Sequence, residues 1–330
     1  MNQIELDHTF KLYPGFTKVS SSIKIIPDRW LPDSLYREPA FELTIMWIIF
    51  AVLNPIFDSL KGVFSKKASK QVDPLLVSWF NNLIPLIVFS PFLFFIDLKF
   101  NYQFFEALFI SGIINVVSAI LYHRALFKGD ISIVIPILSF TPLFLLFLSP
   151  LIVGEFPDSW GLAGTLLIVS GSYLLNINLK RQNIFSPIKS LITDKGTRYM
   201  LIVACIWAIS ANYDKRGINA SSIYQYIIFL NLFVTIGTSI FVFSKRKVSL
   251  NALKLEYKNL SIVGLLTSAG YFVHMTAITL TLVVYVVALK RTGGMISVLL
   301  GYFIFKEQNI RQRLLGSAVM FTGVLLIVLL

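Results

Sequence analysis

Long apolar segments separated by short polar connections make up nearly all of the chain after residue 43. A helix needs about 20 mostly apolar residues to cross the hydrocarbon core of a bilayer. Ten segments of that kind follow one another, at 44–65, 74–96, 104–127, 131–153, 159–178, 197–216, 222–244, 259–280, 281–305 and 311–330. The pattern predicts an all-α polytopic membrane protein with about ten transmembrane helices.

The two halves of the pattern resemble each other. A glutamate followed by two glycines, with eight and six residues between them, occurs at 155–171 and again at 307–323, which is 152 positions later. Five predicted spans in each half, an odd number, require the second half to be inverted relative to the first. Inverted repeats are common in secondary transporters, where substrates bind near the middle of the membrane. We interpret the glycines as packing residues that allow two helices to approach closely.

The same pattern divides the chain into four parts. Residues 1–43 hold four prolines and mixed charge and are expected to be a poorly ordered tail. The first five-helix repeat is expected at 44–178, a basic linker at 179–196 and the second repeat at 197–330. Met46 stands where the first apolar segment starts, which raises the hypothesis that translation begins there.

Composition supports a membrane protein and excludes several other classes. Of the 330 residues, 56% are hydrophobic and 14% are charged, whereas soluble domains carry about 25% charged residues. The net charge of +12 is interpreted as basic loops beside a membrane, so no nucleic acid is expected as a partner. A single cysteine, Cys205, and three scattered histidines give no disulfide within one chain and no metal cluster. Because no nucleophile–base pair or phosphate loop is visible, we expect neither an enzyme nor a cofactor.

Lysine and arginine are divided unevenly between the two sets of connections. The connections after the first, third, fifth, seventh and ninth spans hold 18 of them, at 66–70, 124–128, 180–198, 245–258 and 306–313. The opposite set holds three: Lys99, Lys215 and Arg216. Because basic residues of short loops are retained in the cytoplasm, this distribution predicts a cytoplasmic basic side and both termini outside.

Lys290 and Arg291 are the most informative charges, since they lie about ten residues into the ninth apolar segment. Each cation costs about 2.5–3.5 kcal/mol at the centre of a span. We interpret them as substrate-binding residues that face an anion in a wet cavity. The alternative is a structural ion pair with Asp58. Gly293 and Gly294 follow, at a point where the helix is able to bend.

The first apolar segment carries a second group of candidates, Asn54, Asp58 and Lys61. Asp58 and Lys61 are three residues apart and therefore share a helix face. Three roles stay open for Asp58: one half of a self-neutralised pair with Lys61, a carboxylate that couples transport to a proton or cation, and the resting partner of the ninth-segment cations. Pro55 frees a backbone carbonyl in this helix, so Asn54 and its neighbours are expected to line a cavity.

Histidine and tyrosine side chains complete the candidate substrate site. Tyr271 and His274 share one face of the eighth segment, and His123 near the end of the third is a weaker candidate. Asp214 ends the sixth segment, the repeat counterpart of the first, and is expected to be a pathway or cap residue. Glu155 lies at a span end and is expected to act as a cap or a loop partner for lysines.

Two segments resemble a known family. They are RALFKGDISIVIPILSFTPLFLLFLSPLIVGE (124–155) and YVVALKRTGGMISVLLGYFIFKEQNIRQRLLGSAVMFTGVLLIVL (285–329), and both are similar to EamA-like members of the drug/metabolite transporter superfamily. The resemblance covers roughly 46–330. It implies a ten-helix inverted-repeat carrier that works by alternating access, with a pocket between spans three, four, eight and nine. It also implies cytoplasmic termini, opposite to the charge distribution.

A more distant likeness is to triose-phosphate translocators and nucleotide-sugar transporters. Their ninth span carries a Lys-Arg pair that binds substrate phosphate, and Lys290 and Arg291 match it. Two positions depart from that pattern: Asp58 stands where those carriers have an asparagine, and a lysine that they carry near span four is missing from 131–153.

Taken together, the sequence predicts a secondary transporter of a small anionic or zwitterionic metabolite. The alternatives are a flippase for a lipid-linked substrate and a non-transporting membrane scaffold. The expected partners are the small-molecule substrate and the lipid bilayer, and the protein is expected to be a monomer or homodimer in the plasma membrane.

Overall fold

The computed structural model describes residues 39–177, 183–245, 250–296 and 310–329, and these ranges are helical and contain no strand. The all-helical prediction is therefore confirmed for these residues. The predicted tail up to residue 38, the end of the ninth segment and Glu307 lie outside the described residues. Residues Leu43–Leu330 form one compact unit.

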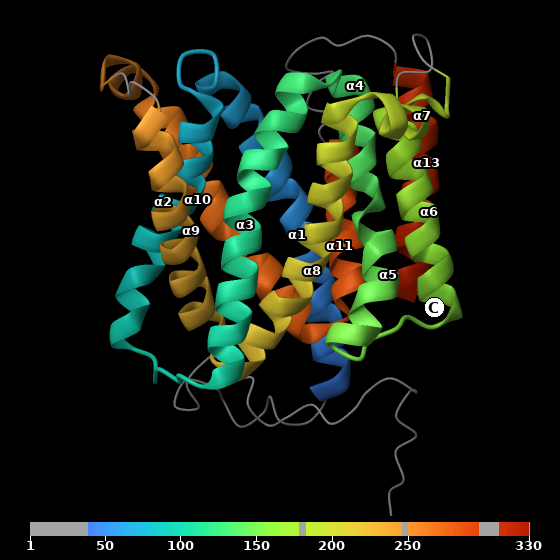
Figure 1. The fold of residues 1–330 in the computed structure, drawn as a ribbon. Helices are drawn as coiled ribbons and strands as arrows, with labels where there is room; N and C mark the ends of the chain where they lie inside the picture. Colours follow the sequence, from blue (N-terminus) through green and yellow to red (C-terminus); the bar gives the residue numbers. More distant parts are fainter. Residues whose placement is uncertain (1–38, 178–182, 246–249, 297–309, 330) are drawn as a thin grey trace, which may run out of the picture. The chain divides into compact units, whose positions relative to one another are not determined.

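The first half of the chain folds into α1 to α6, with two 3₁₀ segments among them (Figure 1). In chain order these are α1 (Pro39–Ala68), α2 (Pro74–Phe89), η3 (Ser90–Phe94), α3 (Tyr102–Lys128), α4 (Ile131–Val134), η4 (Ile135–Phe140), α5 (Thr141–Ile152) and α6 (Ser159–Asn176). The predicted fourth span is thus built from three short pieces. Pro136 and Pro142 lie at the start of η4 and α5, where proline is tolerated because the first amides of a helix have no internal partner.

The second half folds into α7 to α11 and α13. In chain order these are α7 (Ser186–Thr193), α8 (Lys195–Ala220), α9 (Ile223–Lys245), α10 (Leu250–Leu280), α11 (Val283–Arg291) and α13 (Ile310–Leu329). Helix α7 lies within the predicted linker. Helix α11 ends at Arg291, and the amide of Thr292 closes its last turn on the carbonyls of Leu289 and Lys290. One turn residue, Thr292, separates α11 from the helical residues 293–296, which include the two glycines where bending is expected.

Six helices of the described ranges are long and apolar enough to cross a membrane. They span Met46–Ala68, Pro74–Phe94, Tyr102–Lys128, Ile135–Ile152, Ile223–Ser244 and Asn251–Leu280. Ser159–Leu175 and Leu315–Leu329 are shorter apolar helices. Multiple membrane-spanning helices are therefore supported, while the count of ten stays a prediction.

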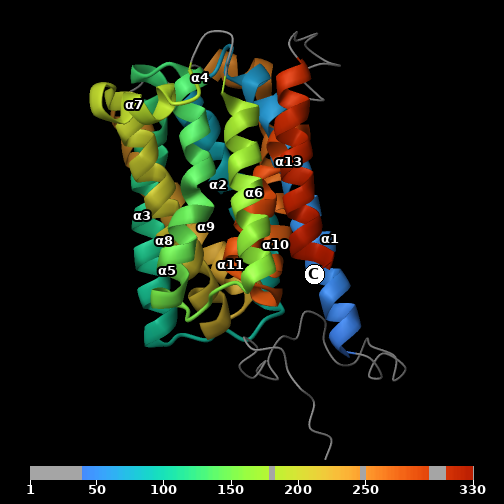
Figure 2. The same ribbon diagram turned by 90° about the vertical axis from the view of Figure 1, so that its right-hand side faces the viewer.

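The four glycines of the repeated motif meet where α6 packs against α13, and the two helices lie side by side in Figures 1 and 2. A Cβ atom on Gly171 would lie 2.6 Å from the carbonyl oxygen of Gly316, and one on Gly323 would lie 2.6 Å from that of Gly164. The numbering runs in opposite directions along the contact, so the helices are antiparallel. The packing interpretation of these glycines is confirmed.

Helices α3 and α8 also pack antiparallel, and a row of polar side chains joins them. Ser111 bonds to Asp214, while Ser118, two turns further along α3, accepts a hydrogen bond of 2.9 Å from Trp207 Nε1. The polar face of each helix is thereby satisfied by the other half of the chain.

Helices α1 and α10 form the corresponding contact. Asn54 Nδ2 donates to the carbonyl oxygen of Gly270 at 3.0 Å, and the Phe50 ring meets Phe272 edge-on at 6.3 Å. Because α1 and α8 open the two halves, this pair is the counterpart of the α3–α8 pair. Both contacts join the first and second halves, as expected for two copies of one unit packed against each other.

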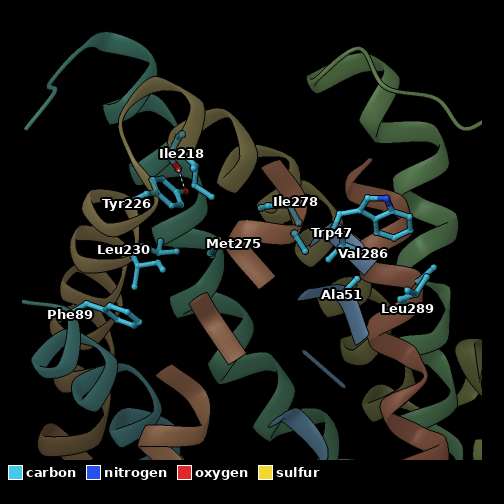
Figure 3. Close-up of a cluster of buried hydrophobic side chains, with 14 of the residues drawn as sticks. Trp47, Ala51, Phe89, Ile218, Tyr226, Leu230, Met275, Ile278, Val286 and Leu289 are labelled. Atoms are coloured by element: carbon cyan, nitrogen blue, oxygen red, sulfur yellow. Dashed lines mark hydrogen bonds between the residues drawn. The ribbon is translucent and has the colours of Figure 1, made fainter. Parts of the chain in front are cut away.

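The largest apolar core cluster draws its side chains from both halves (Figure 3). Those labelled are Trp47 and Ala51 of α1, Phe89 of α2, Ile218 of α8, Tyr226 and Leu230 of α9, Met275 and Ile278 of α10, and Val286 and Leu289 of α11. Val286 and Leu289 precede the two candidate cations, so this core fixes the part of α11 that carries them.

The connections between helices fall into two sets at opposite ends of the helices (Figure 1). On one side, Gly129 after α3 lies against Gly196 at the start of α8. On the other, the Gln225 side chain bonds to the backbone of Lys99, at 2.8 and 2.9 Å. The count of basic residues assumed that successive connections lie at alternating ends of the helices, and the described residues have this arrangement.

Asp194 caps the N-terminus of α8 and gives a stability prediction. Its Oδ2 accepts hydrogen bonds from the backbone N and the Oγ1 of Thr197, at 2.6 and 2.7 Å. Burial acts to raise the pKa of Asp194, but the hydrogen bonds from Thr197 and Gly196 and the charge of Arg198 outweigh it and lower that pKa.

Asp194→Ala is expected to lower the free energy of unfolding by about 1 kcal/mol at neutral pH, because a lost N-cap leaves backbone amides without partners. A lowered folded-state pKa stabilises above the unfolded value, so this difference should shrink as the pH falls below about 4. Thermal unfolding in detergent at both pH values measures it, with the exposed Asp97→Ala as control. An unchanged difference at low pH would contradict the assignment.

Candidate functional site

The polar interior begins on α1, which presents Asn54 and Asp58 one turn apart. Asn54 is 1% exposed, and its bond to Gly270 holds this face against α10. The hydroxyl of Ser59 lies 2.7 Å from the carbonyl oxygen of Pro55 and 2.8 Å from that of Gly293. Ser59 therefore ties α1 to the turn that follows α11.

Asp58 bridges two lysines from different helices. Its Oδ1 lies 2.5 Å from Lys61 Nζ and its Oδ2 lies 3.1 Å from Lys290 Nζ. The side chains of Asp58, Lys61 and Lys290 are 24%, 27% and 32% exposed, so this charged group faces space that solvent is able to enter. Two of the roles left open for Asp58 are thus combined, since it pairs with Lys61 and also with a cation of α11.

Lys290 and Arg291 occupy the last turn of α11. A helix C-terminus carries a partial negative charge, which favours cations in its last turn. Leu289 is 1% exposed, whereas both cations are half-buried. The end of the helix and the Asp58 carboxylate together offset part of the cost of placing two cations in an apolar segment.

Arg291, Tyr271 and His274 complete the group predicted from the sequence. His274 interacts electrostatically with Lys290, Asp58, Arg291 and Lys61, and Tyr271 interacts with Asp214 and with Asp58. All six predicted site residues, from α1, α10 and α11, therefore lie in one region. Tyr122 of α3, which the sequence did not indicate, also interacts with Arg291.

Three of these residues have a buried polar atom without a hydrogen bond. In the part of the chain that the structure describes, eight such atoms occur, and Asn54 Oδ1, His274 Nδ1 and Arg291 Nε are among them. Most buried polar atoms in proteins have a partner. Unsatisfied atoms on α1, α10 and α11 near one charged group are typical of a site that binds a polar ligand or water.

A second polar cluster surrounds Asp214 on α8. Its Oδ1 accepts hydrogen bonds from Ser111 of α3 and from Tyr226 of α9, the latter at 2.9 Å. Ser210, one turn earlier, lies 2.8 Å from Ser111 Oγ. The sequence indicated Asp214 only as a pathway or cap residue. In the sequence, Asp58 and Asp214 each follow an aromatic residue in the segment that opens one half of the chain.

The remaining candidates have structural contacts. His123 Nε2 lies 3.1 Å from Ser78 Oγ of α2. Glu155 pairs with Lys215 and accepts a hydrogen bond of 3.1 Å from the backbone N of Val283. It therefore caps α11 and neutralises a lysine, as predicted. The described residues include no group of three metal-binding side chains.

The class of protein that follows is an all-helical membrane protein of two packed halves, with charged residues gathered in its interior. The EamA-like transporter family matches the chain twice, over residues 45–177 and 194–329. The chain belongs to the EamA-like transporter family, as its sequence features suggested. It is accordingly an integral, multi-pass membrane transporter of small substrates.

The fold has solved counterparts. One crystal structure, described only as that of a protein, matches with a TM-score of 0.66 and 14% sequence identity, covering 87% of this chain and 97% of its own. At this identity the match shows the shared fold alone. No curated protein matches the sequence.

Proposed function

We propose that the protein is a secondary carrier for a small anionic or zwitterionic metabolite. In this proposal ten transmembrane helices form two inverted repeats and the substrate binds between them, next to Lys290 and Arg291. The single observation that carries it is the partly exposed ion pair between Lys290 and Asp58.

An anionic substrate would take the place of Asp58 beside Lys290. Asp58 Oδ1 lies closer to Lys61 than Oδ2 does to Lys290, so Asp58 keeps one cation when it releases the other. Buried cations without a counter-charge are costly, which makes exchange of one anion for another favourable compared with simple release. The ion pair between Asp58 and Lys290 is thus the resting state, and substrate binding would break it.

The unsatisfied atoms of Arg291, His274 and Asn54 support a ligand with several polar groups. Arg291 Nε is a donor, Asn54 Oδ1 is an acceptor, and His274 Nδ1 serves as either one. A carboxylate or phosphate would accept from Arg291, and an ammonium group would donate to Asn54. This combination favours anions and zwitterions over cations.

Alternating access requires a hinge near the site. Helix α11 ends directly at Arg291, and interrupted helices of this kind form the binding sites of many carriers with inverted repeats. Ser59 is the contact that would have to change, because it joins α1 to the turn at Gly293.

The orientation follows from the charge distribution. We propose that the basic connections face the cytoplasm, in the plasma membrane.

Uptake into proteoliposomes tests the carrier, with labelled phosphate, succinate and glutamate as an inorganic anion, a dicarboxylate and a zwitterion. At least one probe should enter faster than into empty liposomes. Arg291→Ala should slow that uptake about 10- to 150-fold, since hydrogen bonds to charged groups contribute about 1.5–3 kcal/mol.

Arg198→Ala is the matched control, because Arg198 is an exposed arginine near the start of α8. It should leave uptake within about twofold, as exposed charges contribute little. If no probe enters, or if Arg291→Ala transports as well as the native protein, the proposed site is wrong.

A further inference from the structure

The molecule contains a second interior carboxylate that the substrate site does not use. Asp214 is 7% exposed and lies in α8, the helix that opens the second half as α1 opens the first. Both acids follow an aromatic residue, Tyr213 and Phe57. Their surroundings differ: Asp58 is held by two lysines, whereas Asp214 is held by hydroxyl groups.

The hydrogen bonds around Asp214 all point toward one oxygen. Asn115 Nδ2 donates to Ser210 Oγ at 2.9 Å, Ser210 lies 2.8 Å from Ser111 Oγ, and Ser111 donates to Asp214 Oδ1. Because the Ser111 hydrogen is used on Asp214, Ser210 must donate to Ser111. Tyr226 donates to the same Oδ1. No hydrogen bond from the described residues reaches Oδ2.

The charged groups near Asp214 have other partners. On its own helix, Lys215 pairs with Glu155 and Arg216 pairs with Glu106. Lys290 of α11 forms its ion pair with Asp58, and its effect on Asp214 is smaller than that of the hydrogen bonds from Ser111 and Tyr226. The other titratable groups that interact with it are Tyr226 of α9 and Tyr271 of α10.

A buried ionised carboxylate without an ion pair is unfavourable unless something neutralises it. A proton does so without any further ligand, whereas a metal ion needs several oxygens around it. The hydroxyls of Ser111 and Tyr226 both direct their hydrogens at Oδ1, which leaves Oδ2 for a proton. The same donors also stabilise the ionised form, so both forms are attainable. Asp58 differs, because an acid that is paired with two lysines is stabilised in its ionised form.

We propose that Asp214 is the proton-binding residue that couples transport to a proton gradient. This inference rests on the carrier function proposed above. When Oδ2 takes a proton from water, Asp214 becomes neutral and no longer attracts Lys290. When the proton leaves, the attraction returns. Lys290 thus responds to Asp214 and to the anion beside Asp58, which links the proton to the substrate through one side chain.

Infrared difference spectra of the purified protein test proton binding without any substrate. Spectra recorded across a pH series should contain a titrating carbonyl band of a protonated carboxyl group. Asp214→Asn should remove the band, and Asp58→Asn should retain it. Ser111→Ala should keep the band at a higher frequency, because Oδ1 loses a donor. A band that survives Asp214→Asn, or no titrating band in the native protein, overturns the proposal.

A transport measurement separates this proposal from the carrier function. With an imposed pH gradient, native protein should accumulate the transported probe above its outside concentration. Asp214→Asn should still equilibrate the probe but should not accumulate it. Accumulation driven by a sodium gradient alone, or gradient-driven accumulation by Asp214→Asn, would overturn proton coupling. Uptake tests the substrate site at Arg291, whereas the infrared band tests proton binding at Asp214. An Arg291→Ala variant that loses uptake but keeps the band would show that the two sites can be tested separately.

Discussion

Lys290→Glu is expected to abolish transport and to lower the free energy of unfolding by about 1–3 kcal/mol, between the values for exposed and for fully buried ion pairs. The new carboxylate would face Asp58, whose Oδ2 lies 3.1 Å from the lysine Nζ. Asp58 would keep its ion pair with Lys61 but would face a second carboxylate. Chemical or thermal unfolding in detergent and uptake into proteoliposomes measure the two effects.

A charge exchange separates a structural ion pair from a substrate site. Asp58→Lys combined with Lys290→Glu restores an attractive pair between α1 and α11, so we expect part of the lost stability to return. Transport should not return, because the cation would then project from α1 instead of from the end of α11. Recovery of both stability and transport would show that the pair has only a structural role.

The matched control is Lys70→Glu, which changes the charge by the same amount at an exposed position beyond α1. Exposed charges contribute little to stability, so both measurements should stay close to those of the native protein. Loss of uptake in this control would mean that net charge, and not the position of the charge, causes the effect.

Gly171→Ala is expected to destabilise the protein by about 1–3 kcal/mol, the usual cost of adding atoms to a well-packed contact. The added Cβ would lie 2.6 Å from both the Gly316 carbonyl oxygen and the Met320 Cγ. Backbone cannot move aside without separating α6 from α13. The unfolding midpoint in detergent should therefore fall.

Gly62→Ala provides a control within the same protein. Apart from its own helix backbone, no atom lies within 4 Å of a Cβ at this position in the second half of α1. Alanine favours a helix over glycine by about 1 kcal/mol, so Gly62→Ala should be neutral or stabilising. Equal destabilisation by both substitutions would contradict close packing as the reason for the glycines of the repeated motif.

Much of the architecture could be predicted because the bilayer imposes a local rule. A segment of about 20 apolar residues can be recognised without knowledge of its neighbours. The helical class, the two halves and the family could therefore be predicted from the sequence. Lys290 and Arg291 were conspicuous for the same reason, as charges inside an apolar segment. The glycine motif was informative because two helices that pack closely need small side chains at regular intervals along their contact.

The partners of these residues could not be predicted in the same way. The contact between Asp58 and Lys290 joins positions 232 residues apart, and hydrogen bonds to Asp214 come from α3 and α9. Sequence spacing reports which residues share a helix face, but not which face of another helix lies opposite. The sequence therefore left three roles open for Asp58 and gave Asp214 only a minor one.

By itself, the sequence of this protein determined that lipid is its solvent, that it is helical and built from two similar halves, and that a few charges lie where charges are costly. These properties depend on composition and on spacing along one helix. Only the tertiary structure decided that Asp58 is held by lysines from α1 and α11 while Asp214 is held by hydroxyls from α3 and α9. The reason is that the state of an interior charge depends on the groups packed around it, and those come from distant parts of the chain.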